Sequence, residues 1–187
     1  MWYTIKAKVV SFFADIRFYN FGLILWGDSH YNLKGPHVRE ILDSLEPGDV
    51  LLRKYDHYLG SRLISGFWSH AAVYIGDNQV VHMLGDGITQ EDILTFTRCD
   101  HMAILRCRDI PLISIAIEKA NQQMTRNLPK PGERRVAYDY DFESGDDKFY
   151  CTEFVSFCYG HPKFEKVGKF ILPDDFLYSI FDKIWSY

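Results

Sequence analysis

One cysteine and two histidines are the residues whose types and surroundings best suit catalysis. Cys151 lies in the segment YCTEFV at residues 150–155, directly after the loop-forming residues 145–148. We therefore expect a helix to begin within a residue or two of this cysteine. Because the positive end of a helix dipole stabilises a thiolate, the position predicts a lowered thiol pKa and a nucleophilic Cys151.

Two histidines are placed to supply the base that activates this thiol. His70 lies in the segment SHAAVYIG at residues 69–76, and His82 follows twelve residues later. Two short strands joined by a turn at residues 76–78 would bring the two imidazoles near each other. We assign His70 as the base that takes the thiol proton and later returns it to the leaving group. His82, or a carboxylate that the sequence does not locate, would hold His70 in the useful tautomer.

The other polar parts of such a site are less specific. The backbone N–H of Cys151 and the hydroxyl of a tyrosine in a strand or loop are expected to bind the oxyanion of the intermediate. Cys158 lies on the same helix face as Cys151 and is predicted to be a core residue. No cofactor and no metal are expected, because Cys99, Cys107 and His101 lack the spacing of a closed zinc site.

Composition favours an ordinary globular protein. A chain of 187 residues fits a single domain, and 47% hydrophobic and 16% aromatic residues argue against disorder. The net charge is −4 and no stripe of lysine or arginine is present, so nucleic acid is not an expected partner. The four cysteines form no CxxC pair, and we predict reduced thiols in a cytoplasmic protein.

The N-terminal residues 1–36 are predicted to form a helical extension. Residues 9–26 are strongly apolar, but Asp15, Arg17 and Asn20 interrupt them, so neither a signal peptide nor a membrane span is expected. The apolar positions recur at spacings of four and three, which is typical of an amphipathic helix. Such a helix would pack on the core, lie on a membrane surface as a peripheral contact, or bind another subunit. The oligomeric state is left open.

The remaining chain predicts a compact α+β domain. Strands are expected near residues 50, 72, 81 and 103, in an antiparallel sheet or small barrel packed against the cysteine helix. Helices are expected at 37–45, 112–124 and 150–159, with a brief helix at 91–94 and a final one opening at 172–176. Residues 127–148 are polar and rich in proline, glycine and aspartate, which predicts a binding loop or lid.

Residues 47–180 resemble the YiiX-like branch of the circularly permuted NlpC-type, papain-like cysteine hydrolases. The order of the motifs also fits, with the histidine strand before the cysteine helix. The resemblance is carried by GDVLL at 48–52, SHAAVYIG at 69–76, YDYDF at 138–142, YCTEFV at 150–155 and LPDD at 172–175.

The resemblance implies a permuted papain-like fold with Cys151 as nucleophile, His70 as base and a polar residue on the next strand, where this chain has His82. In YiiX-like relatives this third residue is often glutamate, and a histidine at this spacing is similar to the lecithin retinol acyltransferase branch. The chain lacks the Asn-Cys-Glu-His-Phe pattern of those acyltransferases. Glu153 is predicted to be structural, because two residues along a helix point it away from the thiol.

The expected function is a cysteine-dependent hydrolase that cleaves an amide bond of peptides or peptidoglycan-type stems through an acyl-enzyme on Cys151. One alternative is a lipid-directed acyl hydrolase or acyltransferase that uses the same thiol. A second alternative is a scaffold that binds a partner without turnover. A polar groove under a lid at 127–148 would suit peptides, whereas a continuous apolar channel would suit acyl chains.

Overall fold

The computed structural model describes residues 31–59, 61, 64–127, 136–141, 148–160 and 170–187, together with the backbone of two short strands near the N-terminus. These strands, β1 (Arg17–Phe18) and β2 (Ile24–Leu25), pair antiparallel. The predicted N-terminal helix is therefore wrong at these four residues, which pair as strands. The rest of that helix lies outside the described residues. None of the described helices combines the length and apolar character needed to span a bilayer.

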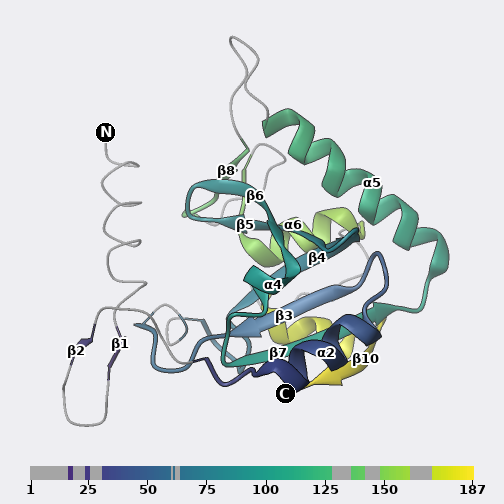
Figure 1. Cartoon of the computed structure of the whole chain (residues 1–187). Helices are drawn as coiled ribbons and strands as arrows, with labels where there is room; N and C mark the ends of the chain where they lie inside the picture. The colour runs from purple at the N-terminus through teal and green to yellow at the C-terminus, as the bar shows by residue number, and fades with distance from the viewer. Residues whose placement is uncertain are drawn as a thin grey trace.

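A six-stranded antiparallel sheet forms the centre of the molecule (Figure 1). The strand order is β10-β7-β3-β4-β5-β6, and within the described residues the sheet is open. The antiparallel sheet is thus confirmed, and the alternative of a small barrel is not. The strands are β3 (Val50–Lys54), β4 (His70–Gly76), β5 (Gln79–Leu84), β6 (Gly87–Asp92), β7 (His101–Cys107) and β10 (Phe181–Ser186).

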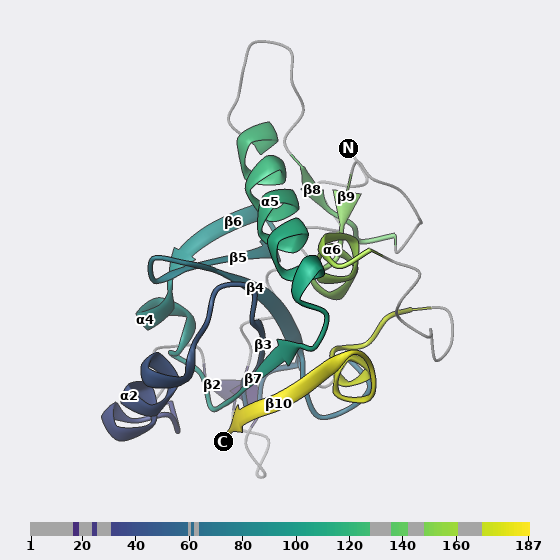
Figure 2. The same ribbon diagram turned by 90° about the vertical axis from the view of Figure 1, so that its right-hand side faces the viewer.

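Helices cover both faces of this sheet. Figure 2 shows α5 and α6 on one side of the strands and α2 and α4 on the other. Both faces of the central strands are consequently buried, which explains the continuous apolar runs of β3 and β4. The helices are α2 (Gly35–Ser44), α4 (Ile93–Phe96), α5 (Ile110–Asn127) and α6 (Cys151–Cys158).

Two apolar cores follow from the alternation of side chains along the strands. Ala71 and Val73 of β4 pack in the larger core, which also holds the α6 residue Phe154. Ala72, the residue between them, faces the smaller core with Phe96 of α4. Neighbouring residues of β4 therefore serve opposite faces of the sheet, and helix α6 packs on the face of Ala71.

The hairpin of β4 and β5 forms where the sequence predicts it. Asp77 and Asn78 at its turn have φ values of 50° and 60°, the left-handed conformation that tight hairpin turns require. The register places Ala72 opposite His82. Since His70 lies two residues before Ala72, its side chain shares the face of His82.

The structure differs from the prediction in the segments that flank these strands. Residues 173–178 form only a short 3-10 helix, η2 (Pro173–Tyr178), and strand β10 follows it. Residues 87–92 form strand β6, so the brief helix predicted at 91–94 begins later, as α4. The predicted loop 127–148 contains β8 (Ala137–Tyr138), which pairs parallel with β9 (Lys148–Phe149). Residues 128–135 and 142–147, where the lid was expected, lie outside the described residues.

Candidate active site

Cys151 is the first residue of helix α6, as the sequence predicts within a residue or two. Its neighbour Tyr150 adopts the extended backbone conformation of an N-cap residue. The side chain of Cys151 is buried, and its sulfur accepts hydrogen bonds from the backbone N–H groups of Ala71 and Thr152. The nucleophile candidate thus lies against strand β4, at the residue that follows His70.

The two histidines form a hydrogen-bonded pair. His70 Nε2 lies 2.8 Å from His82 Nδ1, and the two rings meet edge to face with centroids 5.1 Å apart. The side chain of His82 is fully buried, and Phe96 packs against both rings. The hairpin therefore brings together the two imidazoles that the spacing suggests, and their catalytic roles stay predictions.

The thiol and the imidazole pair approach β4 at adjacent residues. The described hydrogen bonds of the Cys151 sulfur lead to the backbone of Ala71 and Thr152 and to the hydroxyl of Tyr138, whereas that of His70 leads to His82. A direct contact between the sulfur and the His70 ring thus stays a prediction. His70 and Ala71 are consecutive, with Cα atoms about 3.8 Å apart, and their side chains point to opposite faces of β4.

Burial decides the charge states of this site. It raises the pKa of the Cys151 thiol above its ordinary value, although the N–H donors at the start of α6 oppose the effect. Burial and the positive charge of Arg53 lower the pKa of His70 and of His82 well below the ordinary 6.5. The predicted lowering of the thiol pKa is therefore wrong, because burial outweighs the helix start. At pH 7 the thiol and both imidazoles are neutral, and a neutral imidazole can accept a proton.

Tyr138 supplies a hydroxyl group beside the nucleophile. This tyrosine lies on β8, and its hydroxyl donates a hydrogen bond to the sulfur of Cys151. Burial, together with the neighbouring Cys151 and Tyr140, raises the pKa of Tyr138 well above its ordinary value of 10.0, so the hydroxyl keeps its proton. The sequence suggests a tyrosine donor without locating it. The structure places Tyr138, from the YDYDF segment, in a suitable position.

The segment after residue 170 forms hydrogen bonds with both sequence neighbours of Cys151. The hydroxyl of Thr152 donates to the carbonyl of Ile171 at 2.6 Å, and the N–H of Ile171 donates to the Tyr150 hydroxyl at 3.1 Å. Thr152 and Tyr150 are the two neighbours of Cys151 in sequence. The start of α6 is thus tied to one residue of a distant segment.

The same segment also forms hydrogen bonds with the residues that precede His70. The carboxylate of Asp174 accepts the backbone N–H groups of Phe67 at 3.0 Å and Trp68 at 2.9 Å. Gly66 has a φ of +102°, and a Cβ at that position would lie 2.4 Å from Asp174 Oδ2. Glycine is therefore required here for the carboxylate to approach. The LPDD segment contains Asp174, but nothing local to it in the sequence indicates a contact with residues more than a hundred positions away.

The other candidate residues lie apart from this site. Cys158 is fully buried in the larger core, as predicted, and all four cysteines are free thiols. His101 pairs with the carboxylate of Asp56 at 3.0 Å. In the part of the chain that the structure describes, no three histidine, cysteine, aspartate or glutamate side chains are grouped to hold a metal. Glu153 is buried at 8% exposure, which fits the structural role expected for it.

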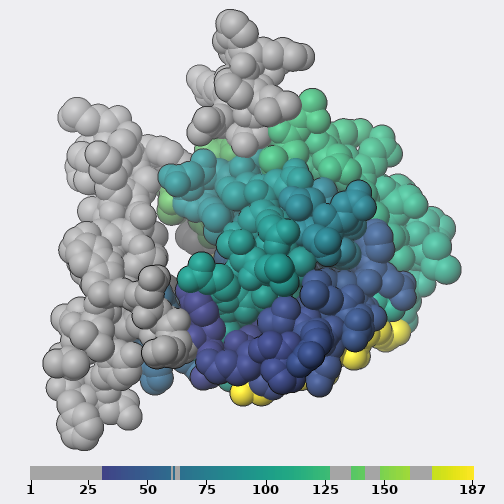
Figure 3. Space-filling model, in the orientation of Figure 1, coloured from purple at the N-terminus to yellow at the C-terminus, as the bar shows by residue number. Residues whose placement is uncertain are grey.

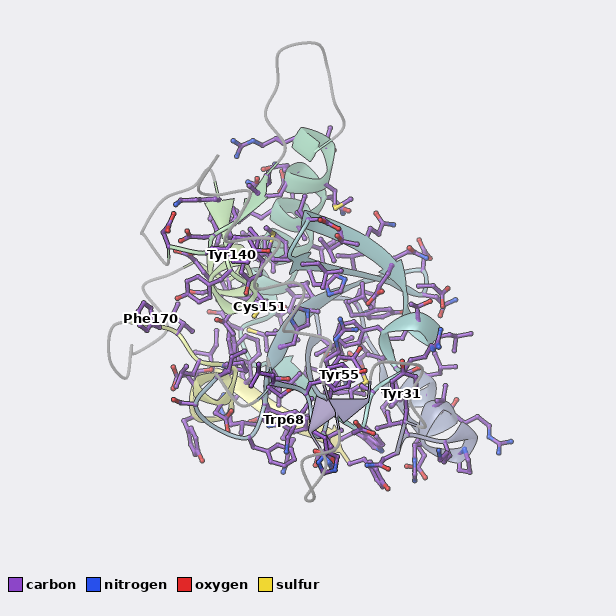
Figure 4. The ribbon with its side chains drawn as sticks, turned by 90° about the vertical axis from the view of Figure 1, so that its left-hand side faces the viewer. Tyr31, Tyr55, Trp68, Tyr140, Cys151 and Phe170 are labelled. Carbon is purple, nitrogen blue, oxygen red and sulfur yellow. The ribbon has the colours of Figure 1, made fainter. Side chains whose placement is uncertain are left out.

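Aromatic side chains surround the nucleophile on one face of the molecule. Figure 4 shows Trp68, Tyr140 and Phe170 on the face where Cys151 is seen. Phe170 is 38% exposed, and Phe67 beside Trp68 is 44% exposed. Apolar surface is thus available to a substrate near the thiol.

Comparison with known proteins identifies the family. A search of curated proteins gave no match. A family model described as the permuted papain-like amidase enzyme, YaeF/YiiX, C92 family, matches residues 44–179. This range covers most of the chain and agrees with the resemblance found over 47–180. The chain therefore belongs to the YaeF/YiiX family of permuted papain-like amidases and is a cysteine-type hydrolase.

Proposed function

We propose that the protein hydrolyses an amide bond of a peptide or peptidoglycan-type stem through a thioester on Cys151. The observation that carries this proposal is the environment of the sulfur, which touches the Tyr138 hydroxyl and the β4 backbone next to His70. The nucleophile would come from the start of α6, the oxyanion donor from β8 and the base from the first residue of β4, which directly precedes Ala71.

The reaction begins when His70 accepts the thiol proton while the sulfur attacks the carbonyl carbon of the substrate. The oxyanion that forms is stabilised by the Tyr138 hydroxyl and the N–H of Cys151. The carbon–nitrogen bond then breaks, and His70 returns its proton to the departing amine. Water attacks the thioester with His70 again as base, which releases the carboxylic acid and restores the thiol.

The test compares substrates and variants. The full-length protein is incubated with peptide amides, peptidoglycan stem peptides and phospholipids, and the products are identified by mass spectrometry. We expect amide cleavage that Cys151→Ala abolishes, with an acyl-enzyme adduct on Cys151 in the wild type. Cys158→Ala, which removes the other thiol of α6, is the matched control and should retain activity. Amide cleavage that survives in Cys151→Ala would overturn the proposal.

A second candidate is the cleavage or transfer of a lipid acyl ester by the same thiol. It is favoured by the aromatic residues on the face where Cys151 is seen, among which Phe170 is partly exposed (Figure 4). The histidine at the third position of the triad, His82, also fits this class. Cleavage of the phospholipids but not of the amides would establish it in place of the first.

A further inference from the structure

An ion pair lies behind the histidine pair. His82 Nε2 is 3.4 Å from Glu91 Oε1, and the same oxygen is 3.1 Å from Arg53 Nη1. The sheet explains this grouping, because Glu91 is paired with Val80 of β5 and Arg53 with His70 of β4. Contacts thus link four side chains from four neighbouring strands into one polar row, from His70 to His82, from His82 to Glu91 and from Glu91 to Arg53.

The row is largely shielded from water. His82 is fully buried, and the side chains of Arg53 and Glu91 are 8% and 19% exposed. The guanidinium of Arg53 also lies over the ring of Phe96, 4.2 Å from its centroid. Figure 3 shows the surface of α2 and of the α4 region covering this side of the sheet. Electrostatic interactions are stronger in such surroundings than in water.

The carboxylate of Glu91, which pairs with Arg53, is the described acidic group that faces His82 Nε2. At 3.4 Å the two atoms do not form a hydrogen bond, but a carboxylate oxygen attracts an N–H and repels a lone pair, so the tautomer with the proton on Nε2 is favoured. The other nitrogen of His82, Nδ1, then has a free lone pair. That lone pair accepts the proton on His70 Nε2, 2.8 Å away. The remaining nitrogen of His70, Nδ1, is left with a free lone pair.

We propose that Glu91 is a positioning residue that fixes the tautomers of His82 and His70, and thereby leaves His70 Nδ1 free to take a proton. The inference rests on the proposed role of His70 as the base for Cys151. Glu91 would be the carboxylate that the sequence could not locate. His82 would link Glu91 to His70, so that the proton position on His82 fixes the proton position on His70.

The opposite order of protons would disable the base. If His82 carried its proton on Nδ1, it would donate to His70 Nε2, and the only proton of a neutral His70 would sit on Nδ1. Without Glu91, the positive charge of Arg53 still acts on His82, and its N–H groups favour a lone pair on His82 Nε2. Removal of the carboxylate should therefore reverse both tautomers rather than merely loosen them.

The test reads the tautomers directly. Long-range ¹H–¹⁵N correlation spectra of histidine-labelled protein distinguish protonated from free ring nitrogens, with signals assigned by single histidine substitutions. In the wild type at pH 7.5 we expect both His70 and His82 to carry the proton on Nε2. In Glu91→Ala we expect the proton of both to move to Nδ1. The rate of Cys151 alkylation by iodoacetamide should then fall about a hundredfold, the low end of what a positioned base contributes.

Two further variants separate this role from a structural one. Glu91→Gln keeps an acceptor oxygen and should retain the wild-type tautomers. Asp92→Asn changes the next carboxylate of the same strand, which caps α4, and should leave both tautomers unchanged. Wild-type spectra with His82 protonated on Nδ1, or unchanged tautomers in Glu91→Ala, overturn the inference even if Cys151 is shown to hydrolyse amides. A reversal in Glu91→Ala upholds it even if no substrate is turned over.

Discussion

Replacing Asp174 by alanine should weaken the fold and the site together. The carboxylate accepts two backbone N–H groups, those of Phe67 and Trp68, in the chain that leads directly to His70. The residues after them enter strand β4, where the N–H of Ser69 donates to the carbonyl of Arg53. The substitution removes both hydrogen bonds at once, so the chain on the N-terminal side of His70 loses its contact with η2.

The size of the effect follows from these two hydrogen bonds. A hydrogen bond to a charged group contributes about 1.5–3 kcal/mol when its partner cannot turn to water. The Phe67 N–H is exposed and can be rehydrated, whereas the Trp68 N–H is partly buried. We therefore expect Asp174→Ala to lower the free energy of unfolding by about 2–4 kcal/mol. Asp174→Asn keeps one acceptor oxygen and should cause about half of this loss.

The assay combines urea unfolding with alkylation of Cys151 under native conditions. Because misplacement of a catalytic group by about 1 Å can cost a hundredfold in rate, we expect Asp174→Ala to slow alkylation at least tenfold. The control is Asp175→Ala, since within the described residues Asp175 accepts a single N–H, that of Leu172 at 2.8 Å. Its loss should cost about 1 kcal/mol and leave alkylation unchanged. The reasoning is refuted if the two variants are equally stable, or if Asp174→Ala alkylates at the wild-type rate.

Two other predictions test the site. Tyr138→Phe removes the hydroxyl beside the sulfur of Cys151, and we expect substrate hydrolysis to fall about a hundredfold. Alkylation, which forms no oxyanion and loses only the hydrogen bond from Tyr138 to the sulfur, should fall much less, and an equal loss in both assays would contradict the role. The lowered pKa values of His70 and His82 predict that stability is lost as pH falls below 6.5, because the unfolded chain binds protons first. Below pH 6.5 the loss of stability should approach about 1.4 kcal/mol per pH unit for each histidine, so urea unfolding from pH 7.5 to 5.5 should show about half of the wild-type pH dependence in His82→Asn. A stability independent of pH in this range would rule the argument out.

The parts of the fold that the sequence predicts are those with strong local signals. The hairpin of β4 and β5 is encoded by two β-branched runs around a turn that contains Asp77 and Asn78. The start of α6 at Cys151 is encoded by the change from loop formers to apolar residues. Both features depend on residues close together in the chain, which is why short patterns are sufficient to predict them.

The parts that could not be predicted depend on distant partners. Strand β10 carries the exposed residues Asp182 and Lys183 and is held by its pairing with β7, about 75 residues earlier in the chain. The contact of Asp174 with Trp68 spans 106 residues. The prediction of a lowered pKa for the Cys151 thiol is wrong for the same reason. The start of the helix is a local feature, whereas the burial of Cys151 depends on the whole fold.

The neutral resting state of the site bears on the choice between amide and ester. A His70 whose pKa is lowered by burial and Arg53 becomes, once protonated, a stronger acid than an ordinary imidazolium. An amine is a poor leaving group unless it is protonated as the carbon–nitrogen bond breaks, so a stronger acid helps this step most. An alcohol leaving group depends less on such help. The lowered pKa also makes His70 a weaker base, while the raised pKa of the Cys151 thiol makes its proton harder to remove. The proposed effect of Glu91 on the tautomer of His70 is therefore more important. The electrostatics of the histidine pair thus favour the amide, while the aromatic face alone would favour an acyl chain.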